Sequence, residues 1–213
     1  ALLRRQHLEE AQRHAALVAR ADSGSSRQEQ AAAHAMLTEI ALARRDPASA
    51  RDEAALVSET SPVQPMPDYV EARLLHAQGR LTDSVPLFEK AAAELSRLHG
   101  QPIAGLHFFA GDALSRLKRY PKAEREFLEE LTYFPQDSRA RAALATVYQK
   151  TGRFDEAGEA ISALTRISPT PDTYQLAARL WETFAEPRRA AAVRAEAHRL
   201  FESTPRPANR TTQ

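Results

Sequence analysis

The stretch from Gly111 to Pro169 decides the fold, and its sequence is GDALSRLKRYPKAEREFLEELTYFPQDSRARAALATVYQKTGRFDEAGEAISALTRISP. It holds two copies of one pattern, displaced from each other by the interval that separates Ala123 from Ala157. The matched positions are Gly111 with Ala145, Leu114 with Tyr148, Tyr120 with Phe154, Ala123 with Ala157, Phe127 with Ile161, and Pro135 with Pro169. Agreement at so many offsets indicates a repeated structural unit.

Each repeated position has a physical reason. The small residues at 111, 123, 145 and 157 allow two helices to approach closely, and the larger apolar and aromatic residues fill the space around that contact. Gly152 supplies the positive φ angle with which many helices end. Pro135 and Pro169 stop the second helix and set the start of the next unit. Each repeat therefore predicts two packed helices joined by a tight turn.

Weaker copies of the pattern lie on both sides of this stretch. On the N-terminal side the matching residues are Ala72, Leu75, Gly79, Leu81, Ser84 and Phe88. The spacing from Ser84 to Ala123 is longer by five than the spacing from Ala123 to Ala157, and we expect the extra residues to form a longer helix end and loop around residues 98–102. One copy further back has Ala50 at this offset, and the last copy has Ala191 there.

These copies predict five helix pairs, which start near residues 28, 65, 104, 138 and 171. Ahead of them, the segment Leu2–Ala21 has apolar residues at helical spacing and no internal turn, so we expect one further helix and about eleven in total. We divide the chain into an N-terminal helix and loop at residues 1–27, a repeat domain at 28–203 and a tail at 204–213. The tail lacks apolar periodicity and is expected to be disordered.

The pattern of small residue, aromatic, turn glycine, alanine, aromatic and proline resembles the tetratricopeptide repeat, whose period is about 34 residues. This resemblance implies an all-α fold, a right-handed α-solenoid of about five helix-turn-helix pairs plus the N-terminal helix. In such a stack each pair is covered by its neighbours, because one pair alone cannot bury its apolar face. An ordinary helical bundle would not need a fixed repeat period.

The composition excludes several classes of function. The 29 basic and 28 acidic residues give a net charge of +1, so no global field attracts nucleic acid or an anionic membrane. Without cysteine, disulfides, thiol catalysis and Cys-ligated zinc are excluded. We expect no membrane insertion, because no apolar stretch approaches the length of a membrane span. The basic residues are nearly all arginine, which suggests a bacterial coding bias; neither compartment nor signal peptide is indicated.

The motifs of common enzyme families are absent, so we predict that the chain is not an enzyme and has no catalytic residue, metal or cofactor. The adjacent carboxylates Asp155-Glu156 and Glu129-Glu130 point about 100° apart on a helix and do not form an acid–base pair. His7 and His14 can share a helix face, but a metal site would need a further ligand. We interpret the remaining isolated histidines, namely His34, His99 and His198, as surface residues.

The resemblance also implies a binding surface, because the first helices of the pairs line the concave face of such a solenoid. The residues at the corresponding positions are Tyr69, Arg73, His76, Phe108, Asp112, Arg116, Arg139, Gln149 and Lys150. Basic groups outnumber acidic ones among them, and Tyr69 and Phe108 can act as aromatic anchors. This set favours a peptide or protein partner with an acidic feature. A generic solvated surface without a dedicated ligand is the open alternative.

Some members of the family bind a C-terminal carboxylate with Lys and Asn at fixed groove positions. In this chain the matching places hold Ala35 with Glu39, Tyr69 with Arg73, and Phe108 with Asp112. None of these copies has the Lys–Asn pair. The resemblance therefore does not imply that this chain binds such a carboxylate.

The sequence predicts a protein–protein interaction scaffold. An alternative is a C-terminal accessory or regulatory domain of a larger enzyme, a hydrolase or a transferase, since the chain opens at Ala1 inside a helical pattern. A third hypothesis is self-association through an apolar edge of the first helix or the last pair. The sequence names no specific partner, because a fold does not fix a function.

Overall fold

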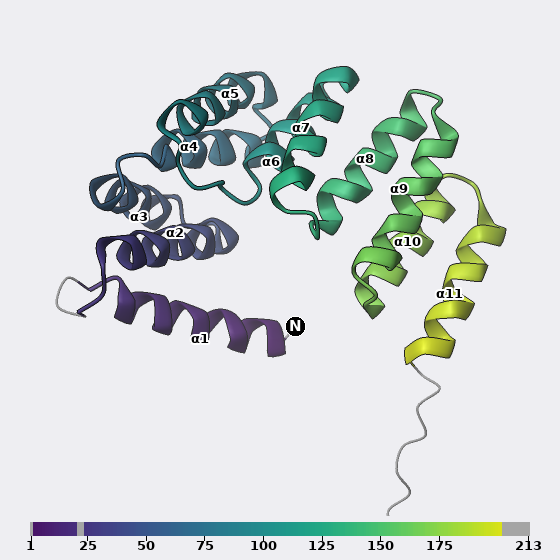
Figure 1. Ribbon diagram of the computed structural model, residues 1–213, viewed down its shortest axis with the longest axis horizontal. Coiled ribbons are helices and arrows are strands. Elements are labelled where there is room, and N and C mark those ends of the chain that lie inside the picture. Colours follow the sequence, from purple (N-terminus) through teal and green to yellow (C-terminus); the bar gives the residue numbers. More distant parts are fainter. Residues whose placement is uncertain (1, 21–23, 202–213) are drawn as a thin grey trace, which may run out of the picture. The chain divides into compact units, whose positions relative to one another are not determined.

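The computed structural model describes residues 2–20 and 24–201, and within them the chain forms eleven α-helices (Figure 1). The helices are α1 (Leu2–Val18), α2 (Arg27–Arg44), α3 (Pro47–Thr60), α4 (Met66–Ala77), α5 (Leu81–Leu98), α6 (Leu106–Arg116), α7 (Tyr120–Tyr133), α8 (Ser138–Lys150), α9 (Phe154–Ile167), α10 (Pro171–Thr183) and α11 (Pro187–Phe201). None of them is long and apolar enough to cross a membrane. The all-α prediction is confirmed.

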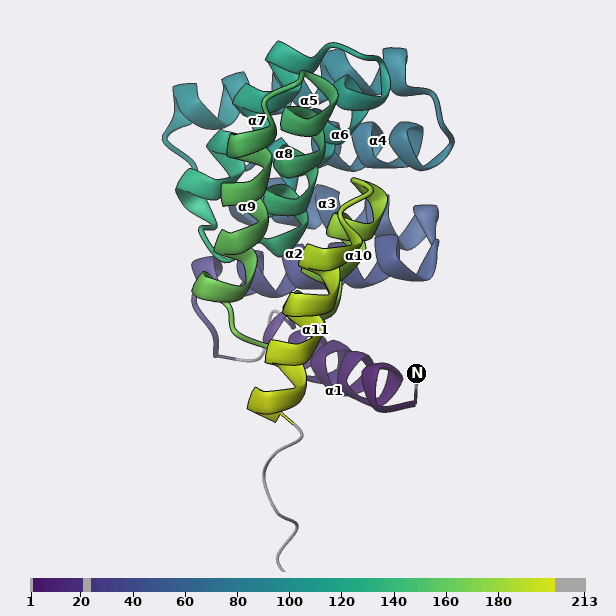
Figure 2. The same cartoon turned by 90° about the vertical axis from the view of Figure 1, so that its right-hand side faces the viewer.

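Helices pack in chain order within two compact units, Ala1–Lys122 and Ala123–Gln213. In the first unit α2 packs on α3 and α4 on α5, while α1 packs on α2. In the second unit α8 packs on α9 and α10 on α11, and both of these pairs can be followed in Figure 2. The first helices also contact each other, α2 with α4, α4 with α6, and α8 with α10. Within each unit the first helices thus form a continuous layer.

The predicted pair starts are confirmed. The first helices of the pairs begin at Arg27, Met66, Leu106, Ser138 and Pro171, each within two residues of its predicted position. The N-terminal segment forms a single helix, as expected. The predicted tail at residues 204–213 lies outside the described residues, and the domain boundaries at 27/28 and 203/204 stay predictions.

Local capping explains why several helices begin where they do. Ser26 forms a capping box with Glu29, in which the Glu29 amide donates to Ser26 Oγ at 3.3 Å and the Ser26 amide donates to Glu29 Oε2 at 2.7 Å. Asp46 caps α3 through the Ser49 amide, next to a proline at the first helical position. These partners satisfy amide groups that have no acceptor within the helix. The starts of α2 and α3 are therefore set by their local sequence.

The turn inside each pair is the same even where the sequence differs. One residue in it has a positive φ angle: Arg45 (+59°), Gly79 (+77°), Lys118 (+59°), Gly152 (+78°) and Ala185 (+61°). The prediction for Gly152 is confirmed. Arg45, Lys118 and Ala185 carry a side chain and adopt this conformation at a cost of roughly 1–2 kcal/mol, because the packing of the helices requires the turn.

Small residues on the second helices are buried as the repeat predicts, with one correction. Ala50, Ser84, Ala123 and Ala157 are at most 1% exposed. In the last pair the buried residue is Ala190, which is 0% exposed, whereas the predicted Ala191 faces solvent. The cause is a repeat that is shorter by one residue, because the positive-φ positions Gly152 and Ala185 are one position closer together than Lys118 and Gly152.

This correction can be tested with two adjacent substitutions. We expect Ala190→Leu to lower the free energy of unfolding by about 1–3 kcal/mol, because the added atoms overpack a closed helix contact. Ala191→Leu is the matched control and is expected to change it by less than about 0.5 kcal/mol. Urea unfolding followed by circular dichroism measures both. Equal losses in the two variants, or a larger loss in Ala191→Leu, would contradict the observed register.

The extra residues in the spacing from Ser84 to Ala123 lengthen both the end of α5 and the connection between α5 and α6. Helix α5 has 18 residues where α9 has 14, and the connection 99–105 follows it, so the predicted longer helix end and loop are both present. Three contacts fasten this connection to α4 and to the loop that precedes α4. Gln64 Nε2 donates to Gln101 O at 3.2 Å, Tyr69 Oη lies 3.3 Å from Ala104 O, and Gly100 packs against the Val63 carbonyl.

Gly100 is the tightest point of this connection. A Cβ at this position would overlap the Val63 carbonyl oxygen and come within 2.6 Å of the Leu95 side chain. We expect Gly100→Ala to lower the free energy of unfolding by about 1–3 kcal/mol, since a backbone carbonyl cannot move aside as a side chain can. Thermal unfolding checks it, and an unchanged midpoint would show that Gly100 is not held against the Val63 carbonyl in this way.

Candidate functional site

A chain of polar and aromatic contacts crosses the layer of first helices in the first unit. Its first part joins α2 to α4. Tyr69 Oη donates to Glu39 Oε1 at 2.9 Å, and Arg73 Nη1 donates to Tyr69 Oη at 2.5 Å. Arg73 Nη1 also lies 3.3 Å from Glu39 Oε2. A carboxylate on one helix thus holds a guanidinium and a phenol on the next.

The second part joins α4 to α6. The Arg73 guanidinium lies 3.6 Å from the ring centroid of Phe109, a cation–π contact, and the His76 ring meets Phe109 edge-on at 5.5 Å. His76 Nε2 lies 2.6 Å from Asp112 Oδ2, and Arg116 Nη1 lies 3.8 Å from the same oxygen. The inner polar cluster consists of Glu39, Tyr69, Arg73, His76, Phe109, Asp112 and Arg116.

Burial differs strongly along the inner polar cluster. Tyr69 is fully buried, and the side chains of Arg73 and His76 are only 15% and 13% exposed. Burial, reinforced by the Glu39 carboxylate, raises the pKa of the Tyr69 phenol above its ordinary value, so the hydroxyl stays a donor at neutral pH. The side chains of Glu39 and Arg116 are 45% and 51% exposed. The cluster therefore has a rigid buried middle and charged ends that face solvent.

The structure brings five of the nine predicted site residues into this cluster: Tyr69, Arg73, His76, Asp112 and Arg116. Because Tyr69 is buried, its ring supports the cluster from inside the unit and is not available as an exposed aromatic anchor for a partner. Phe108 is half-buried on α6 and meets Phe109 edge-on at 4.9 Å.

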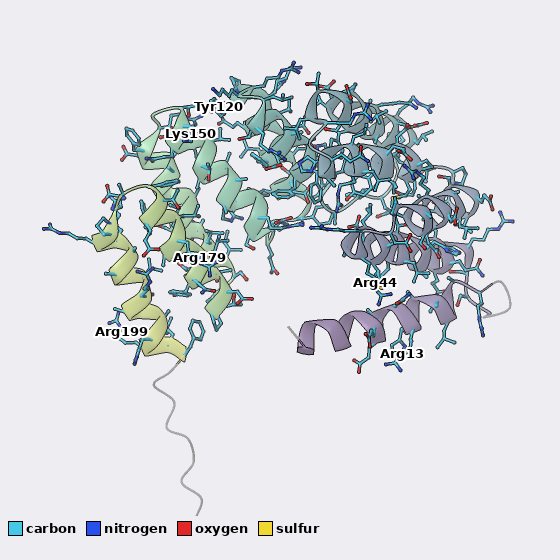
Figure 3. All side chains as sticks on the ribbon, turned by 180° about the vertical axis from the view of Figure 1, so that it is seen from behind. Arg13, Arg44, Tyr120, Lys150, Arg179 and Arg199 are labelled. Atoms are coloured by element: carbon cyan, nitrogen blue, oxygen red, sulfur yellow. The ribbon has the colours of Figure 1, made fainter. Side chains whose placement is uncertain are left out.

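The other predicted residues lie on α8 in the second unit. Arg139 is bound to Asp137, the residue that caps the same helix, with Arg139 Nη2 and Asp137 Oδ2 2.8 Å apart. Gln149 is half-buried and Lys150 is exposed at the C-terminal end of α8, where Figure 3 labels it. The assignment of all nine residues to partner binding stays a prediction.

Sequence reasoning left Glu39 and Phe109 out of the site, although a signal for Glu39 was present. Glu39 precedes Arg73 by one regular repeat interval, and Asp112 follows Arg73 by the longer interval that separates Ser84 from Ala123, so the three occupy one position in successive repeats. Their charges alternate in sign. Because equivalent positions on neighbouring first helices lie side by side, this alternation predicts contacts of opposite charge between them. The contact between Arg73 and Glu39 is of this kind.

One histidine prediction was wrong. His34 was interpreted as a surface residue, but it is 9% exposed and its Nδ1 lies 2.7 Å from Glu53 Oε2 on α3. The acid partner lies 19 residues further along the chain, and only the pairing of α2 with α3 brings it close. In the part of the chain that the structure describes, no three His, Cys, Asp or Glu side chains converge on a metal position.

A pocket of about 420 Å³ opens beside Glu39 in the first unit. One side of it is a stripe of α2 at helical spacing, and the opposite side is the connection between α5 and α6. The lining residues are Gln28, Ala31, Ala32, Ala35, Met36, Glu39, Val57, Ser61, Gln64, Met66, Gln101, Pro102, Ile103 and Ala104. The connection that interrupts the regular repeat period thus forms one wall, and we call this space the connection pocket.

The buried hydroxyl of Tyr69 gives a test of the inner polar cluster. We expect Tyr69→Phe to lower the free energy of unfolding by about 1–2 kcal/mol, because Glu39, Arg73 and the Ala104 carbonyl lose a common partner. Tyr133→Phe is the control, since Tyr133 is exposed and an exposed hydrogen bond contributes little. Chemical unfolding measures both, and equal stability of the two variants would contradict a structural role for the cluster.

Comparisons with known proteins agree with this architecture. The family model described as tetratricopeptide repeat matches residues 116–180. MamA from Desulfovibrio magneticus RS-1, solved from residue 41 to its end, superposes with a TM-score of 0.56 at 18% identity, over 83% of this chain and 97% of that chain. PilW, a widely conserved type IV pilus biogenesis factor, gives 0.59 at 16% identity, over 82% and 80%.

A third similar structure is YrrB, described as a TPR protein with an unusual peptide-binding site. It superposes with a TM-score of 0.53 at 16% identity, over 81% of this chain and 87% of that chain. At these identities the likeness concerns the fold alone. No curated protein matches this chain by sequence.

Proposed function

This chain is a stack of tetratricopeptide-type helix pairs, with the repeat itself matched over residues 116–180, and from this premise we propose that it is a protein-interaction module. Proteins of this type are typically scaffolds for other proteins. We place the binding of a peptide or protein partner on the layer of first helices that each unit forms. We assign no catalytic residue, metal or cofactor to the chain.

The observation that carries the proposal is the inner polar cluster on this layer. Its contacts join α2, α4 and α6 side by side through one hydrogen-bonded and stacked series. A surface that is already held in place loses little conformational freedom when a partner binds, which favours affinity. A generic solvated surface would not need a tyrosine, an arginine and a histidine of α4 that are largely buried and bound to side chains of α2 and α6.

The exposed charges of the predicted set favour a partner with acidic groups. Arg73 is held inside the chain by Glu39, so it acts mainly in positioning. The exposed members are Arg116, Arg139 and Lys150, and all three are cationic. Charges of this kind at the rim of a binding surface steer association and select partners more than they add affinity. The peptide-binding site described for YrrB, which has a similar fold, supports a peptide as one form of partner.

The test compares two matched triple variants in an affinity capture from a lysate of the source organism. The layer variant carries Arg116→Ala, Arg139→Ala and Lys150→Ala. The control carries Arg97→Ala, Arg125→Ala and Arg166→Ala, which removes three exposed cationic side chains from the second helices α5, α7 and α9. Both variants are first shown to unfold at the temperature of the native chain.

We expect a partner that the native chain and the control capture and that the layer variant captures at least several-fold less. The loss follows from removal of charges at the binding surface, which changes association and salt dependence. Retention of the same partner by the layer variant, together with loss in the control, would move recognition to the second helices and contradict the proposal.

A further inference from the structure

The connection pocket exists because one connection in this chain is longer than the regular repeat requires, so it is not a general feature of the repeat. The corresponding connections α7–α8 and α9–α10 are shorter, and the longer connection 99–105 contains the wall formed by Gln101, Pro102, Ile103 and Ala104. The wall is fastened at both ends, by the bond from Gln64 to Gln101 O and by the bond from Tyr69 to Ala104 O. A fastened wall keeps the pocket open without a ligand.

The opposite side of the pocket is shaped by small residues. Gln28, Ala31, Ala35 and Glu39 follow one another at helical spacing along α2, and Ala32 widens the stripe. Alanine at these positions leaves the space that larger side chains would fill. Val57 and Met66, both at most 2% exposed, complete the apolar interior.

The polar groups of the pocket are few, and one of them is charged. Glu39 is the only ionisable side chain among its described lining residues, and the others that are polar are three glutamines and a serine. Glu39 accepts from Tyr69 and Arg73, but its side chain is 45% exposed and a carboxylate offers about four acceptor positions. It can therefore accept a further hydrogen bond from a cation at the mouth of the pocket.

We propose that the connection pocket binds one apolar side chain of a partner peptide, whose neighbouring residue is a lysine or arginine that contacts Glu39. The volume of about 420 Å³ lies within the usual range for ligand pockets and accommodates a leucine, methionine or phenylalanine side chain. The glutamines around it offer amide groups to the peptide backbone. This inference rests on the proposed function, because it names the chemistry that the same layer recognises next to the inner polar cluster.

The chain contains two methionines, Met36 and Met66, and both line the pocket. A sample with ¹³C-labelled methionine methyl groups therefore has two methyl signals, and both report on the pocket. The probe is the peptide N-acetyl-Gly-Leu-Lys-Gly-amide. The comparison peptides are N-acetyl-Gly-Ala-Lys-Gly-amide, which has a smaller apolar side chain, and N-acetyl-Gly-Leu-Glu-Gly-amide, which has the opposite charge. Each is titrated to about 10 mM, where even a millimolar complex is mostly formed.

We expect the Leu-Lys peptide to shift both methionine signals to saturation. The Ala-Lys and Leu-Glu peptides should bind roughly tenfold more weakly, because each lacks one of the two contacts. Ala32→Phe places a large side chain at the mouth of the pocket and should remove the shifts. Its matched control, Ala43→Phe, lies on the same helix outside the pocket lining and should keep them; both alanines are exposed, so the fold tolerates the change.

A second variant separates charge from shape. Glu39→Gln should make the Leu-Lys and Leu-Glu peptides bind equally, whereas Glu71→Gln, a change on α4 outside the pocket lining, should leave the preference for lysine intact. Thermal unfolding of Glu39→Gln shows whether its contacts to Tyr69 and Arg73 are needed for folding.

Three results would overturn the inference: no shift of either signal, equal binding of the Ala-Lys peptide, or unchanged shifts in Ala32→Phe. The proposed function would survive any of them if the lysate capture still depended on Arg116, Arg139 and Lys150. Conversely, the Leu-Lys peptide could bind saturably while the layer variant captures its partner as well as the native chain does. That result would support the pocket proposal and contradict the proposal that the exposed cations of the first helices bind the partner.

Discussion

Close contact between helices at small residues is the constraint on which the rest of the structure depends. Ala50, Ala123, Ala157 and Ala190 have essentially no exposed surface. A larger residue at such a place would push two helices apart, and each unit would lose the regular stacking of its first helices. The positive-φ turns follow from the same constraint, because only a tight turn returns the chain at the right distance. Where Lys118 or Ala185 occupies the turn, backbone strain is accepted to keep the contact.

The inner polar cluster is a consequence of this stacking. Once α2, α4 and α6 lie side by side, equivalent positions on neighbouring helices are close, and the opposite charges of Glu39 and Arg73 come into contact. Arg73 then lies between a carboxylate and an aromatic ring. A largely buried cation of this kind is costly to leave unpaired, so the cluster stabilises the layer as well as shaping its surface.

The sequence predicts the fold well and the site less well, for physical reasons. The helix starts follow the repeat interval, so they could be placed to within two residues, and caps such as Ser26 with Glu29 reinforce some of them locally. The connection between α9 and α10 is one residue shorter than the connection between α7 and α8, which no sequence motif marks, so the residue buried in the last pair is Ala190 and not the predicted Ala191. Exposure and pairing depend on contacts between distant segments. The burial of Tyr69 and the pairing of His34 with Glu53 therefore appear only once the helices are packed.

The connection between α5 and α6 is a place where the sequence can vary while the stack of helices stays the same. Lengthening a loop costs little free energy, about 0.6 kcal/mol for each doubling, and the regular repeat spacing resumes after it. The side chains of residues 101–104 can consequently change while the contacts of the Gln101 and Ala104 carbonyls with Gln64 and Tyr69 are kept. In evolution, substitutions in this connection can alter what the surface recognises while the helices are kept. In protein engineering, the connection is a position at which a new loop can be grafted.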